Sequence, residues 1–264
     1  MSAILLDQEI VHYEVLGRGR PIIFLHGWVG SWRYWIPAMQ VSSISYRAYA
    51  LDLWGFGDTA KDPARYALQG QLRLLDAFLE QMGIARFAVV GHGLGAILAM
   101  LYAWKNPDQV DRILAIGYPM EESWINPRLG SDSPVDLADW LLSRIPTAEP
   151  ARMDAPKTDV QVVEATLASL SLNTTHLGEL WRNTSTSCLL VHGQNDPVIQ
   201  LPRGDELENL PEHMHSVVFE QSGHFPMLDE TNKFNRLLID FLALPSGDSP
   251  RELQVKEEWR RRIR

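Results

Sequence analysis

Short apolar runs rich in β-branched residues alternate with helical segments along most of the chain. These runs predict strands at residues 10–15, 21–25, 46–53, 87–90, 112–116, 187–191 and 215–219. We expect the first two to pair through the glycine-containing turn at 17–20. Helices are expected over about 68–82, 94–105 and 230–242, the first with Leu72, Leu75 and Leu79 on one face. This alternation predicts an α/β fold with a mostly parallel sheet and helices on both faces.

The strand pattern lapses in the middle of the chain, where helix-compatible sequence is broken by Ser and Pro. We therefore expect an α/β core of residues 1–118 and 187–244, with a helical cap inserted at 119–186. Residues 245–264 are expected to form a linker and a charged tail. Val255, Trp259 and Ile263 recur every four residues beside clustered arginines in that tail. Such a basic amphipathic segment fits an anionic membrane surface or a protein partner, and equally a helix folded back on its own domain.

Composition narrows the class of protein. The 264 residues are 45% hydrophobic, enough to bury one large α/β core. A net charge of −9 argues against a nucleic-acid partner, which would need a basic surface. We see neither a signal peptide nor an apolar run long enough for a membrane span, so we expect a cytoplasmic protein. The single cysteine, Cys188, lies in an apolar run and is expected to be a buried, inert thiol.

A glycine-rich pentapeptide, Gly91-His92-Gly93-Leu94-Gly95, follows a buried strand and opens a helix. It resembles the nucleophile elbow of the α/β-hydrolases, Gly-x-Ser-x-Gly, whose middle residue sits in a strained turn with its side chain above the sheet. Here the middle residue is Gly93, which has no side chain. The resemblance implies an α/β-hydrolase fold whose catalytic nucleophile is missing.

Three further motifs carry the same resemblance, in the chain order that this family shows. His26-Gly27-Trp28 resembles the oxyanion loop, which implies that the backbone N–H groups of Trp28 and Leu94 stabilise a developing oxyanion. Residues 52–58 are similar to the family's Asp-x-x-Gly-x-Gly-x-Ser loop, although turn chemistry alone explains them. Asp196, before Pro197, matches the family's acid, and His224 matches its general base.

A rival interpretation of the elbow is a dinucleotide site, because Gly91-x-Gly93-x-x-Ala96 also satisfies the Gly-x-Gly-x-x-Ala fingerprint. That fingerprint belongs on the first strand of its unit, with an acidic residue about 20 positions later that closes the next strand. Several predicted strands precede this one, and Asp111 and Glu121 flank the next strand rather than close it. We therefore expect no cofactor, and no metal-ligand cluster is visible in the sequence.

Glycine at the elbow excludes the usual covalent step of these hydrolases. His92 leaves the turn in a different direction from residue 93 and is expected to pack beside the elbow. Three interpretations remain. The protein is a disabled ester or acyl hydrolase, whose glycine is natural or engineered. It is an enzyme that uses His224 and Asp196 as a general base on a water or an acidic substrate proton. Or it is a non-catalytic module that binds a small ligand or a partner.

The expected pocket is apolar and rich in tryptophan, which favours a small apolar ligand or substrate. Ligands of open α/β sheets bind beyond the carboxyl ends of the strands. Several of the tryptophans follow predicted strands or belong to the predicted cap, which places them near that region. Trp32 stands at helical spacing from Trp28, a pattern more typical of core packing. The residues expected at the pocket are His26, Gly27, Trp32, Trp54, His92, Trp124 and Trp140.

Overall fold

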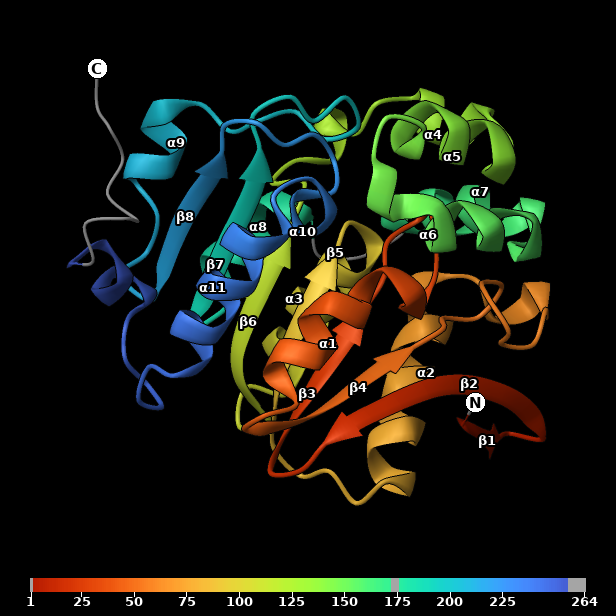
Figure 1. Cartoon of the computed structure of the whole chain (residues 1–264), viewed down its shortest axis with the longest axis horizontal. Coiled ribbons are helices and arrows are strands. Elements are labelled where there is room, and N and C mark those ends of the chain that lie inside the picture. Colours follow the sequence, from red (N-terminus) through yellow and green to blue (C-terminus); the bar gives the residue numbers. More distant parts are fainter. Residues whose placement is uncertain (1, 172–175, 256–264) are drawn as a thin grey trace.

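An eight-stranded sheet forms the centre of the protein in the computed structural model, which describes residues 2–171 and 176–255 (Figure 1). The strands lie in the order β1-β2-β4-β3-β5-β6-β7-β8. The antiparallel pairs are β1 with β2 and β2 with β4, and the pairs from β4 through to β8 are parallel. The strands are β1 (Ser2–Leu6), β2 (Glu9–Gly17), β3 (Arg20–Leu25), β4 (Tyr46–Leu51), β5 (Phe87–His92), β6 (Val110–Ile116), β7 (Cys188–Gly193) and β8 (Met214–Phe219). The predicted mostly parallel sheet is confirmed.

The predicted pairing of the first two runs is wrong. Strand β4 inserts between β2 and β3, so that β2 pairs with β1 and β4, and β3 pairs with β4 and β5. Ile22, Ile23 and Phe24 of β3 have no exposed surface, which suits a central strand with a neighbour on each side. The short connection at 17–20 resembles a hairpin turn locally, but burial on both sides of β3 decides the pairing. The sequence pattern also missed β1, a short strand at the sheet edge.

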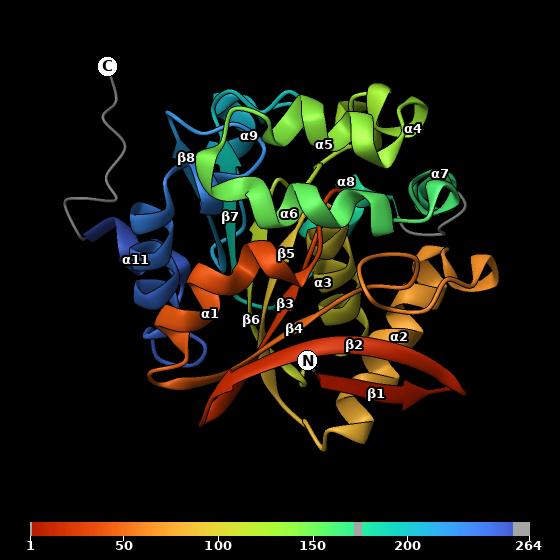
Figure 2. The same ribbon diagram turned by 45° about the vertical axis from the view of Figure 1, so that its right-hand side comes forward.

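Helices cover both faces of the sheet (Figures 1 and 2). Helices α1 (Ile36–Ser42) and α11 (Thr231–Leu242) lie in contact on one face. Helices α2 (Leu68–Gln81), α3 (Leu94–Lys105) and α8 (Leu177–Asn183) lie on the other. Helix α3 packs on β5 and β6 and also touches α2 and α8, so that every residue from Leu94 to Ala103 is buried. This enclosure explains why the segment is apolar all round rather than on one side only.

The described part of residues 119–186, here called the cap segment, consists mainly of short helices and the connections between them. Its first helices lie above the carboxyl ends of the parallel strands in both views (Figures 1 and 2). These helices are α4 (Arg128–Ser131), α5 (Pro134–Leu142), α6 (Glu149–Asp154) and α7 (Val160–Ser171). The remaining helices are α9 (Gly204–Glu208) and α10 (Pro226–Asp229), with 3-10 turns at Trp32–Trp35, Pro63–Arg65, Glu122–Trp124, Pro146–Ala148, Ala155–Lys157 and Pro250–Val255.

The segment after α11 is fastened to the core over residues 246–255. Ser246 donates a 2.6 Å hydrogen bond to Asp111, and Arg251 donates one of 2.6 Å to the carbonyl of Leu210. Leu253 of the last 3-10 turn has no exposed surface. The predicted linker is therefore partly docked, while positions 256–264 of the predicted charged helix lie outside the described residues. In the part of the chain that the structure describes, no helix is both long and apolar enough to cross a bilayer.

Candidate active site

Gly93 alone makes the turn between β5 and α3. Its φ of +51° and ψ of −110° lie in a region that side-chain-bearing residues rarely adopt. Gly95 permits a second feature of the turn, because a Cβ there would collide with the backbone carbonyl of Leu25 at the end of β3. The strained strand-to-helix turn that the resemblance implies is present, and Gly93 at its centre carries no side chain.

His224 and Asp196 form a buried pair at the carboxyl ends of the strands. The Nδ1–H of His224 donates to Asp196 Oδ2 at 2.9 Å, and Asp196 Oδ1 accepts the backbone N–H of Val198 at 2.8 Å and of Ile199 at 3.1 Å. Burial alone would raise the pKa of Asp196, but His224 and the two backbone N–H groups outweigh it and lower that pKa. Asp196 is therefore ionised, holds the Nδ1 proton, and leaves Nε2 of His224 as the basic atom.

A chain of hydrogen bonds fixes His92 between the oxyanion loop and His224. The backbone N–H of Gly27 donates to Tyr34 Oη at 2.6 Å, and this hydroxyl lies 3.1 Å from His92 Nδ1. Nε2 of His92 lies 2.9 Å from the backbone carbonyl of His224, so Nε2 carries the proton and Nδ1 accepts from the hydroxyl. Burial and the neighbouring His224 lower the pKa of His92 well below its usual value. His92 is thus a neutral brace, and Tyr34 is a site residue that the sequence analysis missed.

His26 and Gly27 shape the loop rather than present side chains to a ligand. His26 has no exposed surface; its Nδ1–H donates to the carbonyl of Gly27 at 2.8 Å, and its Nε2 accepts the N–H of Leu53 at 3.0 Å. Burial lowers the pKa of His26, which keeps it neutral in this role. A Cβ on Gly27 would lie 2.9 Å from His92 Nδ1, so only glycine fits there.

The side chain of Trp28 lies over Gly93. A Cβ built on Gly93 would be 3.2 Å from Trp28 Cε3 and 3.3 Å from Cζ3, with the Cα of Gly27 at 3.7 Å. The loop that carries the Trp28 N–H therefore borders the elbow. The N–H of Leu94 is the first of α3, where N–H groups have no partner within the helix. Both backbone groups of the expected oxyanion hole thus belong to segments that border Gly93.

The other tryptophans expected at the pocket make contacts typical of packing residues. The ring of Trp32 lies 5.8 Å from that of His12. The guanidinium of Arg65 lies 4.9 Å over Trp54, and that of Arg128 lies 4.3 Å over Trp140. Trp124 lines a cavity of about 230 Å³ together with Met120, Glu121, Trp181, Arg182, Glu206 and Asn209. Neither Gly93 nor His224 lines this cavity, so it is not the space above the elbow.

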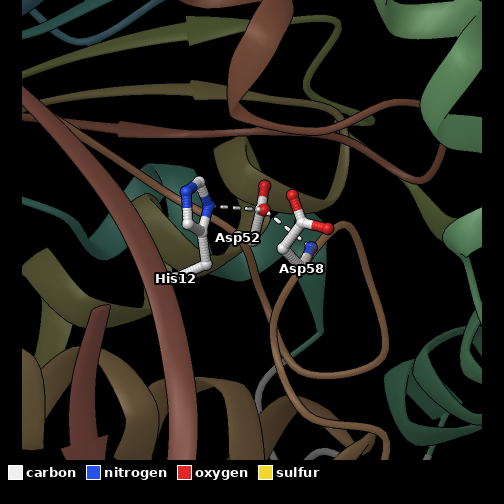
Figure 3. Close-up of side chains that lie close together, drawn as sticks. All are labelled: His12, Asp52 and Asp58. Atoms are coloured by element: carbon white, nitrogen blue, oxygen red, sulfur yellow. Dashed lines mark hydrogen bonds and ion pairs between the residues drawn. The ribbon is translucent and has the colours of Figure 1, made fainter. Parts of the chain in front are cut away.

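Among the described residues, one cluster has ligand atoms close enough for a cation, namely His12, Asp52 and Asp58 (Figure 3). Oδ2 of Asp52 accepts His12 Nδ1–H at 2.9 Å and the N–H of Asp58 at 3.0 Å, while Oδ1 accepts the N–H of Trp32 at 2.9 Å. The carboxylate of Asp58 pairs with Lys157 at 2.9 Å. Because these donors occupy the carboxylate oxygens, the cluster fits a brace between β2 and the loops after β3 and β4 better than a metal site. The sequence analysis did not single out His12.

The chain is similar to known hydrolases in sequence. The model of the alpha/beta hydrolase family matches residues 22–237. The chain is 24% identical over 254 residues to the pimeloyl-[acyl-carrier protein] methyl ester esterase of Vibrio cholerae, covering 88% of this chain and 97% of that one. It is 26% identical over 258 residues to the 2-hydroxy-6-oxo-2,4-heptadienoate hydrolase of Pseudomonas putida, covering 86% of this chain and 91% of the relative.

Solved structures share the fold. A mutant of the meta-cleavage product hydrolase CumD from Pseudomonas fluorescens IP01, in complex with acetates, superimposes with a TM-score of 0.77 at 22% identity. The match covers 92% of this chain and 97% of that one. At this identity the likeness concerns the fold alone, which agrees with the sheet order and the strand-to-helix turn described above.

Proposed function

Because the chain belongs to the α/β-hydrolase family, we propose that it is a general-base enzyme that acts on a small apolar substrate without a covalent intermediate. The observation that carries the proposal is the 2.9 Å pair of His224 and Asp196 at the carboxyl ends of the strands, beside an elbow that holds Gly93. The relatives of the chain include a methyl ester esterase and a 2-hydroxy-6-oxo-2,4-heptadienoate hydrolase, and hydrolysis is a reaction that a positioned general base promotes.

Proton transfer is the step that the remaining groups support. Nε2 of His224 takes a proton from a water or from an acidic position of the substrate, and the Asp196 carboxylate stabilises the imidazolium that forms. In ester hydrolysis the water oxygen bonds to the carbonyl carbon, the bond from that carbon to the alcohol oxygen breaks, and Nε2 returns the proton to the alcohol oxygen. The N–H groups of Trp28 and Leu94 stabilise the oxyanion of the intermediate. A positioned general base contributes about 10² to 10⁴ in rate, much less than a complete triad with its nucleophile.

The surroundings of the base favour an apolar substrate. Trp28, Leu94 and Phe225 are almost completely buried, and His224 is only 5% exposed. A charged substrate would lose its hydration in such a site without a matching partner of opposite charge, whereas an apolar ester or ketone would not. We place the protein in the cytoplasm as part of this proposal, since its single cysteine is buried and free.

Ester hydrolysis tests the proposal directly. The parent chain and its His224→Ala and Gly93→Ser variants are assayed with p-nitrophenyl acetate and butyrate. We expect slow turnover by the parent with no initial burst of p-nitrophenol, and its loss in His224→Ala. The exposed His176, whose side chain is 67% accessible, supplies the matched control His176→Ala, which should keep the parent rate. Gly93→Ser should add a burst, because a hydroxyl at the elbow restores the acyl-enzyme.

A non-catalytic binding protein is the second candidate, favoured by the closure of the site beneath Trp28, which is 1% exposed. Equal, background rates for the parent and His224→Ala would overturn the general-base proposal. A rise in melting temperature with a hydrolysis-resistant ester analogue in that case would establish binding alone. Turnover only in Gly93→Ser would instead identify a disabled hydrolase.

A further inference from the structure

We infer that the indole of Trp28 is a gate over the elbow, and that helix α7 of the cap segment holds this gate shut through Thr166. The gate controls the same site as His224 and Asp196, so its biological meaning rests on the proposed function. Its physical basis is independent of turnover, because it follows from the contacts of Trp28 with Gly93 below and with Thr166 above.

The indole fills the space into which a nucleophile would project. A Cβ on Gly93 would meet Cε3 and Cζ3 of Trp28 at 3.2 and 3.3 Å, closer than ordinary van der Waals contact. A side chain at this position therefore requires the indole to move by a few tenths of an ångström. Glycine at 93 and tryptophan at 28 are complementary, since the missing side chain makes room for the large ring.

The orientation of the ring is set by the cap segment. The only polar group of an indole is its N–H, and Nε1 of Trp28 donates to Thr166 Oγ1 at 2.9 Å. That hydroxyl in turn donates to the carbonyl of Val163, also at 2.9 Å. Thr166 has no exposed surface, so water does not compete for the bond. Removing the acceptor would leave the ring held by packing alone.

Helix α7 is itself tied to the loop that follows β4 and to the first residue of α2. Before the helix starts, the N–H of Asp159 donates to the carbonyl of Gly55 at 2.8 Å. Near its end, Ser169 Oγ accepts the N–H of Leu68 at 3.0 Å. Thr166 lies between these ties. A movement of α7 that broke them would carry Thr166 away from Trp28 and free the indole.

The described conformation is closed. Trp28 is 1% exposed and His224 is 5% exposed, so a ligand reaches the base only after part of this cover moves. Trp28 also stands between Gly27 and Gly30 in its loop, and Gly30 has a φ of +101° that favours glycine. The indole of Trp28 lies over position 93 and is joined to α7 by one hydrogen bond, so breaking that bond and moving the ring would expose position 93.

A thiol at position 93 measures the gate without any substrate. It shifts the indole by the same few tenths of an ångström wherever Trp28 is kept, so those backgrounds remain comparable. The native Cys188 is fully buried and burial raises the pKa of its thiol, so a Gly93→Cys variant reports on position 93 alone. Its rate of reaction with 5,5′-dithiobis(2-nitrobenzoate) is compared in four backgrounds: the parent, Thr166→Val, Thr166→Ser and Trp28→Phe. Melting temperatures of all four identify any background that fails to fold, and Trp28→Phe keeps an aromatic ring while it removes the N–H.

We expect slow labelling in the parent background and about tenfold faster labelling with Thr166→Val and with Trp28→Phe. The reason is that the loss of one hydrogen bond shifts the equilibrium between the closed and open positions of the ring by about this factor. Thr166→Ser retains the hydroxyl and should leave the rate within about twofold of the parent.

Equal rates in the parent and Thr166→Val backgrounds, or a thiol that is fully reactive in the parent background, would overturn the gate. Faster labelling in Thr166→Val with no ester turnover in the parent chain would support the gate and reject the general-base function. Ester turnover by the parent chain together with equal labelling rates would support the general-base function and reject the gate.

Discussion

The Nε2–H of His92 donates a 2.9 Å hydrogen bond to the backbone carbonyl of His224. This bond joins the last residue of β5 to the loop that carries the base, and the two imidazole rings lie 4.5 Å apart. The histidine beside the elbow is therefore a mechanical link between the elbow and the base. It fixes the backbone of His224 while Asp196 fixes its ring, so that both the position and the tautomer of the base are determined.

Replacing His92 with Phe should destabilise the protein and misplace the base. The change leaves the carbonyl of His224 and the hydroxyl of Tyr34 buried without their partner, at a cost of about 1–3 kcal/mol each. Urea unfolding measures the stability, and the ester assay measures kcat. His92→Gln, which retains a donor, should lose less of both. An unchanged free energy of unfolding in His92→Phe would show that the hydrogen bonds of His92 do not contribute to stability.

Replacing Asp196 with Asn should lower kcat by up to about 10⁴ while substrate binding changes little. The amide donates where the carboxylate accepts, so it favours the wrong tautomer of His224 and cannot stabilise the imidazolium. The pH–rate profile and KM are measured alongside kcat. Asp139→Asn is the matched control, because that carboxylate is 60% exposed and pairs with Arg152. A rate equal to the parent's would mean that His224 works without its partner.

The stability of the parent chain should fall more steeply with acid than that of a His192→Leu variant. Burial lowers the pKa of His192 to about 4, and its Nε2 has no hydrogen-bond partner among the described residues. Above pH 6.5 the residue is neutral in both the folded and the unfolded state. Below pH 6.5 the unfolded chain binds a proton at this imidazole and the folded chain does not, which lowers the free energy of unfolding by about 3 kcal/mol at pH 4.

Urea unfolding at pH 7, 5.5 and 4 measures this effect. The variant should match the parent most closely at pH 7 and exceed it increasingly at lower pH, because the other buried histidines are common to both chains. A parent-to-variant difference that is constant across this range would show that His192 does not titrate differently on folding.

Cys188 should be unreactive until the protein unfolds. It lies in β7 with no exposed surface, and burial raises the pKa of its thiol. Labelling of the native chain should be at least about 10³-fold slower than in guanidinium chloride, because only the unfolded fraction reacts. The Cys188→Ala variant gives the background. Fast labelling of the native chain would contradict the described burial and would also remove the basis of the thiol test at position 93.

Local signals along the chain determined the elements and the order of the motifs. Local apolar patterns placed α2, α3 and the parallel strands, because a one-sided spacing in α2 and continuous apolar runs in α3 and the strands belong to each segment by itself. The elbow was recognisable for the same reason, since Gly91, Gly93 and Gly95 are close in sequence, although the need for glycine at 95 comes from the distant carbonyl of Leu25.

Tertiary structure alone decided which elements lie side by side and which side chains meet. The pairing of β2 with β4 instead of β3 depends on burial of β3 from both sides, which no local turn encodes. The tie between Trp28 and Thr166 spans 138 positions, and that between His92 and His224 spans 132. Such contacts carry no periodic signal, because they arise when the sheet and the cap segment are packed together. The sequence by itself determined that a glycine without a side chain stands at position 93, and only the packed fold showed that the indole of Trp28 lies over it.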